Sequence, residues 1–301
     1  MRRRRGRRHC WSRPRANRER ERTSRCGERM ASGIHAVRLA LGVEYDGRRY
    51  AGWQSQRHAP SVQETVEKAI SRVADHPVAV TCAGRTDAGV HALGQVVHFD
   101  SPSPRDPYSW LRGVTSNLPN DVALTWVQPV AEDFDARFAA TARSYRYAIL
   151  CRQTRPGLFH GRVAWTWKAL DAARMQTAAR ALLGEHDFTS YRAIACQARH
   201  ARRCVTRLDV VADGPFVYLD ITANAFLHHM VRNIAGVLMA IGAGEAEIDW
   251  AAEVLAARDR RAGGITAPAD GLYMVSVAYP QRFGLPEPPA PPVFASPQGA
   301  G

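Results

Sequence analysis

The feature of this 301-residue sequence that most restricts its fold is the order in which strand-type and helix-type patterns follow one another. Residues 36–45 carry apolar side chains at alternate positions, which is typical of a half-buried strand. A helix is predicted from Ser61, because Ser61 and Glu64 have the spacing of a capping box. The remaining patterns predict strands at 77–82, 95–100 and 122–130, with a helix that begins at Asp106-Pro107 and ends before Pro119. The order is β-α-β-β-α-β.

The second half of the sequence repeats this order without repeating the sequence itself. A helix is expected between Asp171 and Gly184, a long helix from about Ala225, and a short one capped by Asp249. Strands are expected at 144–151, 204–211, 216–223 and 272–279. We therefore predict an α+β fold of two ferredoxin-like or RRM-like units, residues 35–135 and 136–280, with antiparallel sheets and a cleft between the units.

Positive charge is concentrated at the amino-terminal end. Residues 1–29 contain 13 Arg and 3 Glu, so they hold ten of the thirteen net positive charges. A segment of this composition buries little apolar surface, and we expect residues 1–34 to be disordered. It is either an arm that binds RNA through charge alone or a stretch upstream of a true start at Met30, and we favour the second. Residues 281–301 contain six prolines and are also expected to be disordered.

The cysteines and the hydropathy indicate the compartment. The six cysteines include no C-x-x-C pair, which argues against a disulfide framework and a zinc ribbon and favours reduced thiols in a cytoplasm. No apolar run reaches the length of a membrane span, so no membrane is expected as a partner.

The loop between the second and third predicted strands carries the strongest candidate for chemistry. It reads GRTDAGVHA over residues 84–92, with Asp87 between Gly84 and Gly89. Glycines permit tight turns and the close approach of a ligand. Taken alone, the loop is more typical of a structural turn in which Asp87 caps its own backbone.

Longer strings decide between these two interpretations. GRTDAGVHALGQVVHF resembles the signature of the tRNA pseudouridine synthase A family, and further strings in the same order are similar to it as well. They are YDG and AGWQSQ (residues 45–56), SVQE (61–64), NLP (117–119), FDARFAA (134–140), RSYRY (143–147), GEHDFTSY (184–191), FLHHMVRNIAG (226–236) and GLYMVSVAYP (271–280). The resemblance spans roughly Val37 to Pro280 and departs from the family pattern at His228, Tyr191 and Ala269-Asp270.

The resemblance implies an isomerase that converts uridine to pseudouridine in the anticodon arm of tRNA, at positions 38, 39 and 40, as a homodimer and without a cofactor or metal. Asp87 falls on the family's catalytic aspartate, as nucleophile or base. Arg232 interrupts an apolar helix, where an unpaired guanidinium is costly, and the resemblance makes it the ion-pair partner of Asp87 rather than a side chain that extends to solvent. Tyr145 falls on the tyrosine that stacks on the base and could transfer a proton, although Tyr145 and Tyr147 share one strand face and either could be core.

Several other residues are candidates for contact with tRNA. They are Arg85, Arg48, Trp53, Gln54 and His91, with a core position for Trp53 equally compatible with its sequence context. His228 and His229 are expected on one helix about 100° apart, which would prevent a shared ligand face, so no metal site is predicted.

The sequence lacks the motifs of two other classes of protein. A non-catalytic RNA-binding protein built from two RRM-like units would need RNP aromatics, and a zinc deaminase would need H-x-E with P-C-x-x-C. Neither pattern occurs in the sequence.

Overall fold

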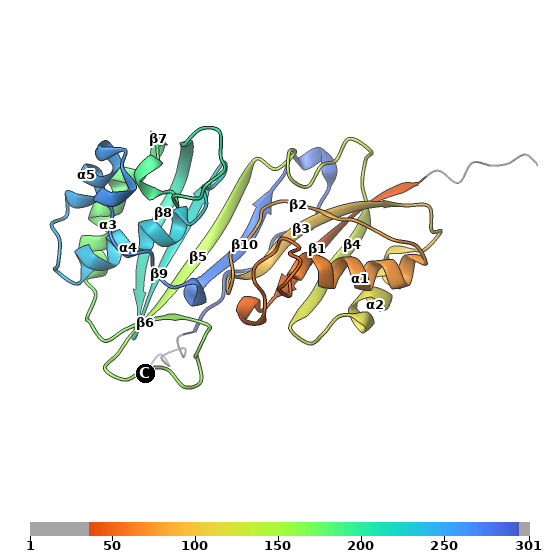
Figure 1. Cartoon of the computed structure of the whole chain (residues 1–301), viewed down its shortest axis with the longest axis horizontal. Coiled ribbons are helices and arrows are strands. Elements are labelled where there is room, and N and C mark those ends of the chain that lie inside the picture. Colours follow the sequence, from red (N-terminus) through yellow and green to blue (C-terminus); the bar gives the residue numbers. More distant parts are fainter. Residues whose placement is uncertain (1–35, 295–301) are drawn as a thin grey trace, which may run out of the picture. The chain divides into compact units, whose positions relative to one another are not determined.

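The computed structural model describes residues 36–294 and has a mixed α+β fold with five α-helices and a ten-stranded, mainly antiparallel sheet in this range. Figure 1 shows the elements in chain order. The strands are β1 Val37–Tyr45, β2 Thr81–Cys82, β3 His91–Ser101, β4 Val122–Pro129, β5 Ala142–Cys151, β6 Ala164–Thr166, β7 Gly184–Asp187, β8 Arg202–Asp213, β9 Phe216–Ala223 and β10 Leu272–Ala278. The helices are α1 Val62–Ala74, α2 Pro107–Asn117, α3 Ala172–Ala179, α4 Met230–Gly242 and α5 Trp250–Ala257.

All ten strands belong to one sheet, whereas two separate sheets were expected. Its order is β4-β1-β3-β10-β5-β9-β8-β7, with β2 on β3 and β6 on β5. The join is β10, the last strand within residues 36–294, which pairs in parallel with β3 and antiparallel with β5 (Figure 1). Tyr273 lies opposite His91 on one side and opposite Arg146 on the other. The sheet therefore holds the two halves of the sequence side by side.

The predicted helix starts at Ser61 and Asp106 are confirmed by their hydrogen bonds. The backbone N–H of Glu64 donates to the Ser61 hydroxyl at 3.2 Å, and that of Ser109 donates to Asp106 Oδ1 at 2.9 Å. The Glu64 side chain does not complete the capping box, because its carboxylate pairs with Lys68 one turn later.

Other boundaries differ from the prediction. Strand β3 starts at His91, four residues earlier than expected, while β2 is reduced to two residues. Helix α4 starts at Met230 instead of near residue 225. Asp249 precedes α5 but makes no side-chain capping hydrogen bond. Strands β6 and β7 were not predicted, because they are only three and four residues long.

Aromatic side chains fill the core on both sides of the join. Trp53, Trp110 and Phe134 in the first half and Tyr147 and Tyr191 in the second are almost completely buried. Helix α2 contacts α1 and β4, and helix α3 contacts α4 and β8, so each pair of helices covers its own strands. None of the helices in residues 36–294 combines the length and the apolar character that a membrane crossing needs.

The structure describes part of one of the two terminal segments that were expected to be disordered. Residues 1–34 lie outside the described part of the chain. In the proline-rich segment, residues 281–294 are ordered against the sheet, which corrects the expectation of disorder there. The Arg146 guanidinium donates to the Pro292 carbonyl at 3.0 Å, and the Phe294 N–H donates to the Tyr218 hydroxyl at 2.8 Å. Residues 295–301 again lie outside the described range.

Candidate active site

Buried polar contacts fix the loop that carries Asp87 to the core. The Thr86 hydroxyl lies 2.8 Å from the Tyr45 hydroxyl, and the Thr86 carbonyl accepts a hydrogen bond from the Trp53 N–H at 3.0 Å. A tight turn follows, in which the Val90 N–H donates to the Asp87 carbonyl and Gly89 has a φ of 77°. Thr86 is buried, whereas the Asp87 side chain keeps 21% of its surface exposed. The turn therefore presents the carboxylate at the surface on a fixed support.

The beginning of the same loop is fixed by Gln95 and Arg143. The fully buried Gln95 side chain donates to the Gly84 carbonyl at 2.6 Å and accepts from the Gly84 N–H at 3.4 Å. Arg143 on β5 donates to the Ala83 carbonyl at 2.9 Å and to the Arg137 carbonyl at 2.7 Å. Neither residue was predicted to have this role. The polar Gln95 within the apolar run of β3 is a sequence signal that could have indicated it.

Gly52 is required where the neighbouring loop crosses the Asp87 loop. It has a φ of 99°, and a β-carbon there would lie 2.7 Å from the Thr86 carbonyl oxygen. We expect Gly52→Ala to lower the free energy of unfolding by about 1–3 kcal/mol and to reduce turnover by displacing Asp87. Gly214→Ala is the matched control, because Gly214 has a φ of 56° but no atom within 4 Å of the added carbon. Equal turnover in the two variants, measured beside their thermal unfolding, would contradict this role for Gly52.

Three side chains from the second half of the sequence surround the Asp87 carboxylate. Arg232 Nη1 lies 3.5 Å from Oδ2, His229 Nε2 lies 3.5 Å from Oδ2, and His228 Nε2 lies 3.4 Å from Oδ1. The carboxylate thus faces one permanent cation and two imidazoles. The structure brings Asp87 and Arg232 together although 144 positions separate them in the sequence, counted from their residue numbers.

The two histidines do not lie on one helix, which corrects the expectation that they point in different directions. Helix α4 begins only at Met230, and His229 before it has left-handed backbone angles (φ 61°, ψ 6°). This conformation, which is uncommon outside glycine, turns both rings to one side with their centroids 4.0 Å apart. Burial lowers the pKa of His229, and the charge of Asp87 acts in the opposite direction.

A loop from the carboxyl-terminal region orients Arg232. Arg232 Nε donates to the Ala267 carbonyl at 2.8 Å, and the Ala267 N–H donates to the Arg232 carbonyl at 3.1 Å. Arg260 fixes that loop through the Gly264 carbonyl at 2.9 Å and the Thr266 hydroxyl at 3.0 Å. With Nε held on the Ala267 carbonyl, the end of the guanidinium is directed at Asp87. The sequence contains no recognisable signal for this support.

Tyr145 lies beside the Asp87 loop, on strand β5. Its ring is 8% exposed and packs edge to face against Phe226, with the centroids 5.0 Å apart. Burial and the nearby negative charge of Asp87 raise the pKa of Tyr145, so its phenol is neutral. Tyr147 is fully buried and donates to the Pro268 carbonyl at 2.8 Å, which makes Tyr147 a core residue.

The residues expected to contact RNA have different surroundings. Arg85 is exposed next to Asp87, and Arg48 is exposed but paired with Asp46 at 2.5 Å. Gln54 is half-buried and donates to Gln63 at 3.0 Å. Trp53 is only 1% exposed, so its indole belongs to the core and is not available to a ligand. Of the two positions that the sequence left open for Trp53, the structure has the core position.

His91 is also buried, and its expected contact with RNA is corrected in the same way. Its ring accepts the Gly47 N–H at Nδ1, donates to the Gly161 carbonyl from Nε2, and stacks on Tyr273 at 4.6 Å. Burial lowers the pKa of His91, and the opposing charge of Asp46 does not reverse this. His91 therefore fastens the first turn after β1 to the core.

This burial predicts a loss of stability in mild acid. A histidine whose pKa is lowered by folding binds protons preferentially in the unfolded chain, so stability falls as pH drops below about 6.5. We expect the melting temperature of the wild type to fall as the pH is lowered from 7.5 to 5. His91→Gln should reduce the slope of melting temperature against pH. Part of the slope should remain, because burial also lowers the pKa of His98. The exposed His58→Gln is the control, and a slope unchanged in His91→Gln would contradict the assignment.

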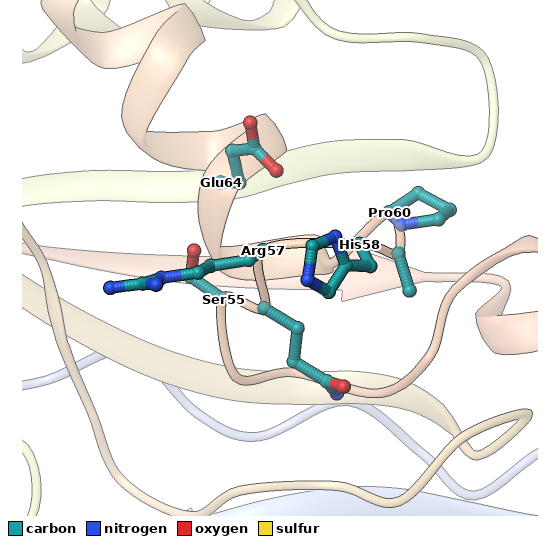
Figure 2. A pocket seen from close by; sticks show the side chains of 7 residues that line it. Ser55, Arg57, His58, Pro60 and Glu64 are labelled. Carbon is teal, nitrogen blue, oxygen red and sulfur yellow. The ribbon is translucent and has the colours of Figure 1, made fainter.

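A surface pocket of about 510 Å³ lies beside the start of helix α1. Residues 55–60 and Glu64 line it, with Arg57 and His58 from the loop and Glu64 from the first turn of α1 (Figure 2). Asp87 does not contribute to its wall. The carboxylate and this pocket are separate features of the surface, and the chemistry described above belongs to the carboxylate.

The sequence is similar to proteins of one family over most of its length. Residues 42–139 and 178–280 match the family described as tRNA pseudouridine synthase. A protein named tRNA pseudouridine synthase A from Enterobacter sp. (strain 638) is 55% identical over 257 residues, which cover 85% of this chain and 95% of that protein. Proteins of the same name from Aeromonas hydrophila subsp. hydrophila (55% over 258 residues, covering 86% and 96%) and Shigella boydii serotype 4 (54% over 261 residues, covering 87% and 97%) are similar to the same extent. The matched segments contain Asp87, both histidines and Arg232.

Proposed function

The chain belongs to the tRNA pseudouridine synthase family and isomerises uridine to pseudouridine in tRNA, and from this premise we propose that Asp87 is its catalytic carboxylate. The observation that carries the proposal is the arrangement of charges. A partly exposed carboxylate on a rigid turn faces the guanidinium of Arg232 at 3.5 Å. A positioned carboxylate with a counter-charge is what the reaction requires from a single group.

The reaction conserves all atoms of the nucleoside. The glycosidic bond from ribose C1′ to uracil N1 breaks, the base turns, and C1′ bonds to C5. The proton that C5 loses is balanced by the proton that N1 gains. Asp87 either attacks C1′ as a nucleophile or removes a ribose proton as a base. Arg232 keeps the carboxylate oriented in both cases.

Tyr145 is the residue placed to contact the base. Its ring lies next to the Asp87 loop, and its neutral hydroxyl can take up the C5 proton only while it passes its own proton to an acceptor such as the Asp87 carboxylate. We expect Tyr145→Phe to retain tRNA binding and to lower turnover about 100-fold. Tyr147→Phe is the control: it loses the hydrogen bond to the Pro268 carbonyl, so it should lose stability while turnover per folded molecule is retained. If Tyr145→Phe turns over at the wild-type rate, its hydroxyl does not transfer a proton.

The tRNA side of the site is proposed from exposed side chains near Asp87. Arg85 is the adjacent cation on the same loop, and Phe138, which is 79% exposed, has the Arg137 guanidinium 5.2 Å from its ring centre. Arg143 bonds to both the Asp87 loop and the Arg137 carbonyl, so the two segments are joined. An exposed ring beside cations suits an unstacked base and its phosphates.

We propose that the active site lies in a cleft between two ferredoxin-like units, residues 35–135 and 136–280. In the first half the strand order β4-β1-β3 with β2 on β3, and in the second the order β10-β5-β9-β8, correspond to the strand neighbours of that unit. We also propose that the protein acts in the cytoplasm as a homodimer. Light scattering should then give twice the 33.3 kDa of one chain.

The proposed function is tested by mapping the product. The full chain is incubated with unmodified tRNA transcripts, and pseudouridine is located at single-nucleotide resolution. We expect modification in the anticodon arm at positions 38, 39 and 40. Pseudouridine confined to another arm would retain the enzyme class but overturn the proposed target, and no pseudouridine in any transcript would overturn the activity.

A further inference from the structure

We propose that Asp87, His228 and His229 form a binding site for one divalent transition-metal ion of the zinc type, and that the bound ion inhibits the enzyme. Binding follows from the geometry of the three side chains alone. Inhibition rests on the proposed function, because it requires Asp87 to be the catalytic carboxylate. The ion is an inhibitor here, and the reaction does not use it.

The donor atoms have the spacing that such an ion needs. One ligand atom from each of the three side chains lies within 4.8 Å of the others. The two distances to the carboxylate are 3.4 Å from His228 Nε2 and 3.5 Å from His229 Nε2. Tetrahedral zinc holds its nitrogen and oxygen ligands at about 2.0–2.2 Å, which puts neighbouring donors roughly 3.4 Å apart. The side chains have to turn toward one another for all three donors to reach one ion.

The types of donor select the class of ion. Two imidazole nitrogens and one carboxylate oxygen suit zinc, cobalt(II) and nickel(II), whereas magnesium and calcium favour sites made of oxygen atoms alone. The side chains of His228, His229 and Asp87 are 42%, 28% and 21% exposed, so an ion can reach them from solvent. Water would complete the coordination on the exposed side.

The backbone around the histidines makes this arrangement persistent. His229 has its left-handed conformation immediately before helix α4, and the Asn233 N–H donates to the His229 carbonyl at 2.9 Å. The His228 carbonyl accepts from the Ala193 N–H at 2.9 Å. The two rings are therefore carried on a backbone that hydrogen bonds hold on both sides.

Arg232 opposes the ion, and this provides a distinctive test. Its Nη1 lies 3.5 Å from Asp87 Oδ2, so it competes with a metal for the same carboxylate. Removing this cation should strengthen metal binding by about tenfold, since a divalent ion and a guanidinium a few ångströms apart repel each other. A variant that merely damaged the site would bind the ion more weakly.

Occupancy should block turnover in competition with tRNA. A carboxylate coordinated to a divalent ion has part of its negative charge neutralised, so it is a weaker nucleophile toward the ribose and a weaker base for its proton. The ion also covers the face of Asp87 that the ribose must approach. We expect zinc at micromolar concentration to raise KM more than it lowers kcat, and a chelator to restore the original rate.

The experiment uses the full chain in two assays, one of metal binding without tRNA and one of turnover with tRNA in the presence of zinc. Cobalt(II) and zinc are titrated without tRNA, with visible absorption for cobalt and a competing indicator dye for zinc. Absorption also identifies the ligands, because cobalt bound to a thiolate of one of the six cysteines has an intense charge-transfer band that a nitrogen and oxygen site lacks. The variants are His228→Ala, His229→Ala, Asp87→Asn and Arg232→Met. The exposed His58→Ala is the matched histidine control, and circular dichroism checks that each variant is folded.

The expected result is one ion per chain, bound at least tenfold more weakly in the first three variants and unchanged in His58→Ala. Arg232→Met should bind it more tightly. A thiolate spectrum, or equal affinity in wild type, His228→Ala and Asp87→Asn, would overturn the site. Stoichiometric binding with no effect on turnover would overturn the inhibition. Because the titrations contain no tRNA, they are independent of the role of Asp87, and turnover retained in Asp87→Asn would count against the proposed function alone.

Discussion

Asp87→Asn should fold, bind tRNA and form pseudouridine only at a trace rate. The amide has the size of the carboxylate but lacks its negative charge, so it can neither attack C1′ nor accept a ribose proton. We expect turnover to fall by about 10⁴-fold or more. The side chain is partly exposed on a loop fixed through Thr86, so the melting temperature should change little.

The measurement is single-turnover formation of pseudouridine, with tRNA affinity measured in parallel. Asp209→Asn is the matched control, because Asp209 is an exposed partner of Arg207 on the strand β8 and lies outside the proposed site. That variant should turn over at the wild-type rate. Substantial turnover in Asp87→Asn would remove Asp87 from the mechanism.

Arg232→Met should lower turnover about 100-fold while tRNA affinity changes little. Methionine retains the packing of helix α4 but leaves Asp87 without its permanent cation, and the loss of one pre-organised charge has an effect of this size. Arg232→Lys should recover only part of the rate. A lysine cannot donate to the Ala267 carbonyl and reach Asp87 at the same time, as the guanidinium does at 2.8 and 3.5 Å. Arg112→Met, an exposed change on helix α2, is the control.

A double-mutant cycle separates the paired site from two independent residues. If Arg232 acts through Asp87, adding Arg232→Met to Asp87→Asn should cost much less than it does in the wild type. Residual turnover is measured with enzyme in excess over tRNA. Additive losses would show that Arg232 acts elsewhere, for example on a phosphate, and a lower salt dependence of tRNA binding would then accompany them.

Local patterns were sufficient to predict most of the elements. The alternation in residues 36–45 corresponds to β1, and Ser61 caps α1 as expected, because both signals are contained within a few neighbouring residues. The single continuous sheet could not be predicted in this way. The pairing of β10 with β3 joins residues about 180 positions apart, and two of its register partners, Tyr273 and His91, have no complementary pattern in the sequence.

The candidate site likewise combines residues that local motifs predicted with an arrangement that they could not predict. Asp87 and Arg232 were identified from motifs, and the structure places them 3.5 Å apart. The side-by-side rings of His228 and His229 depend on one left-handed residue before α4, a conformation that the residue type disfavours, so no propensity could predict it. The core and surface positions of Trp53 could not be separated, and His91 was expected at the surface, because burial is decided by the packing of distant segments.

The position of β10 at the join has a consequence for how the protein is made. Until residue 278 has left the ribosome, β3 and β5 have no strand between them, and each presents unpaired backbone groups. Arg232 and the loop that supports it also precede β10 in the chain. The half of the sheet that they belong to is nevertheless joined to the half that carries Asp87 only when β10 pairs with β3 and β5. Nascent chains that stop short of β10 should therefore be inactive and prone to aggregate, and the enzyme becomes competent only after residue 278 has been synthesised.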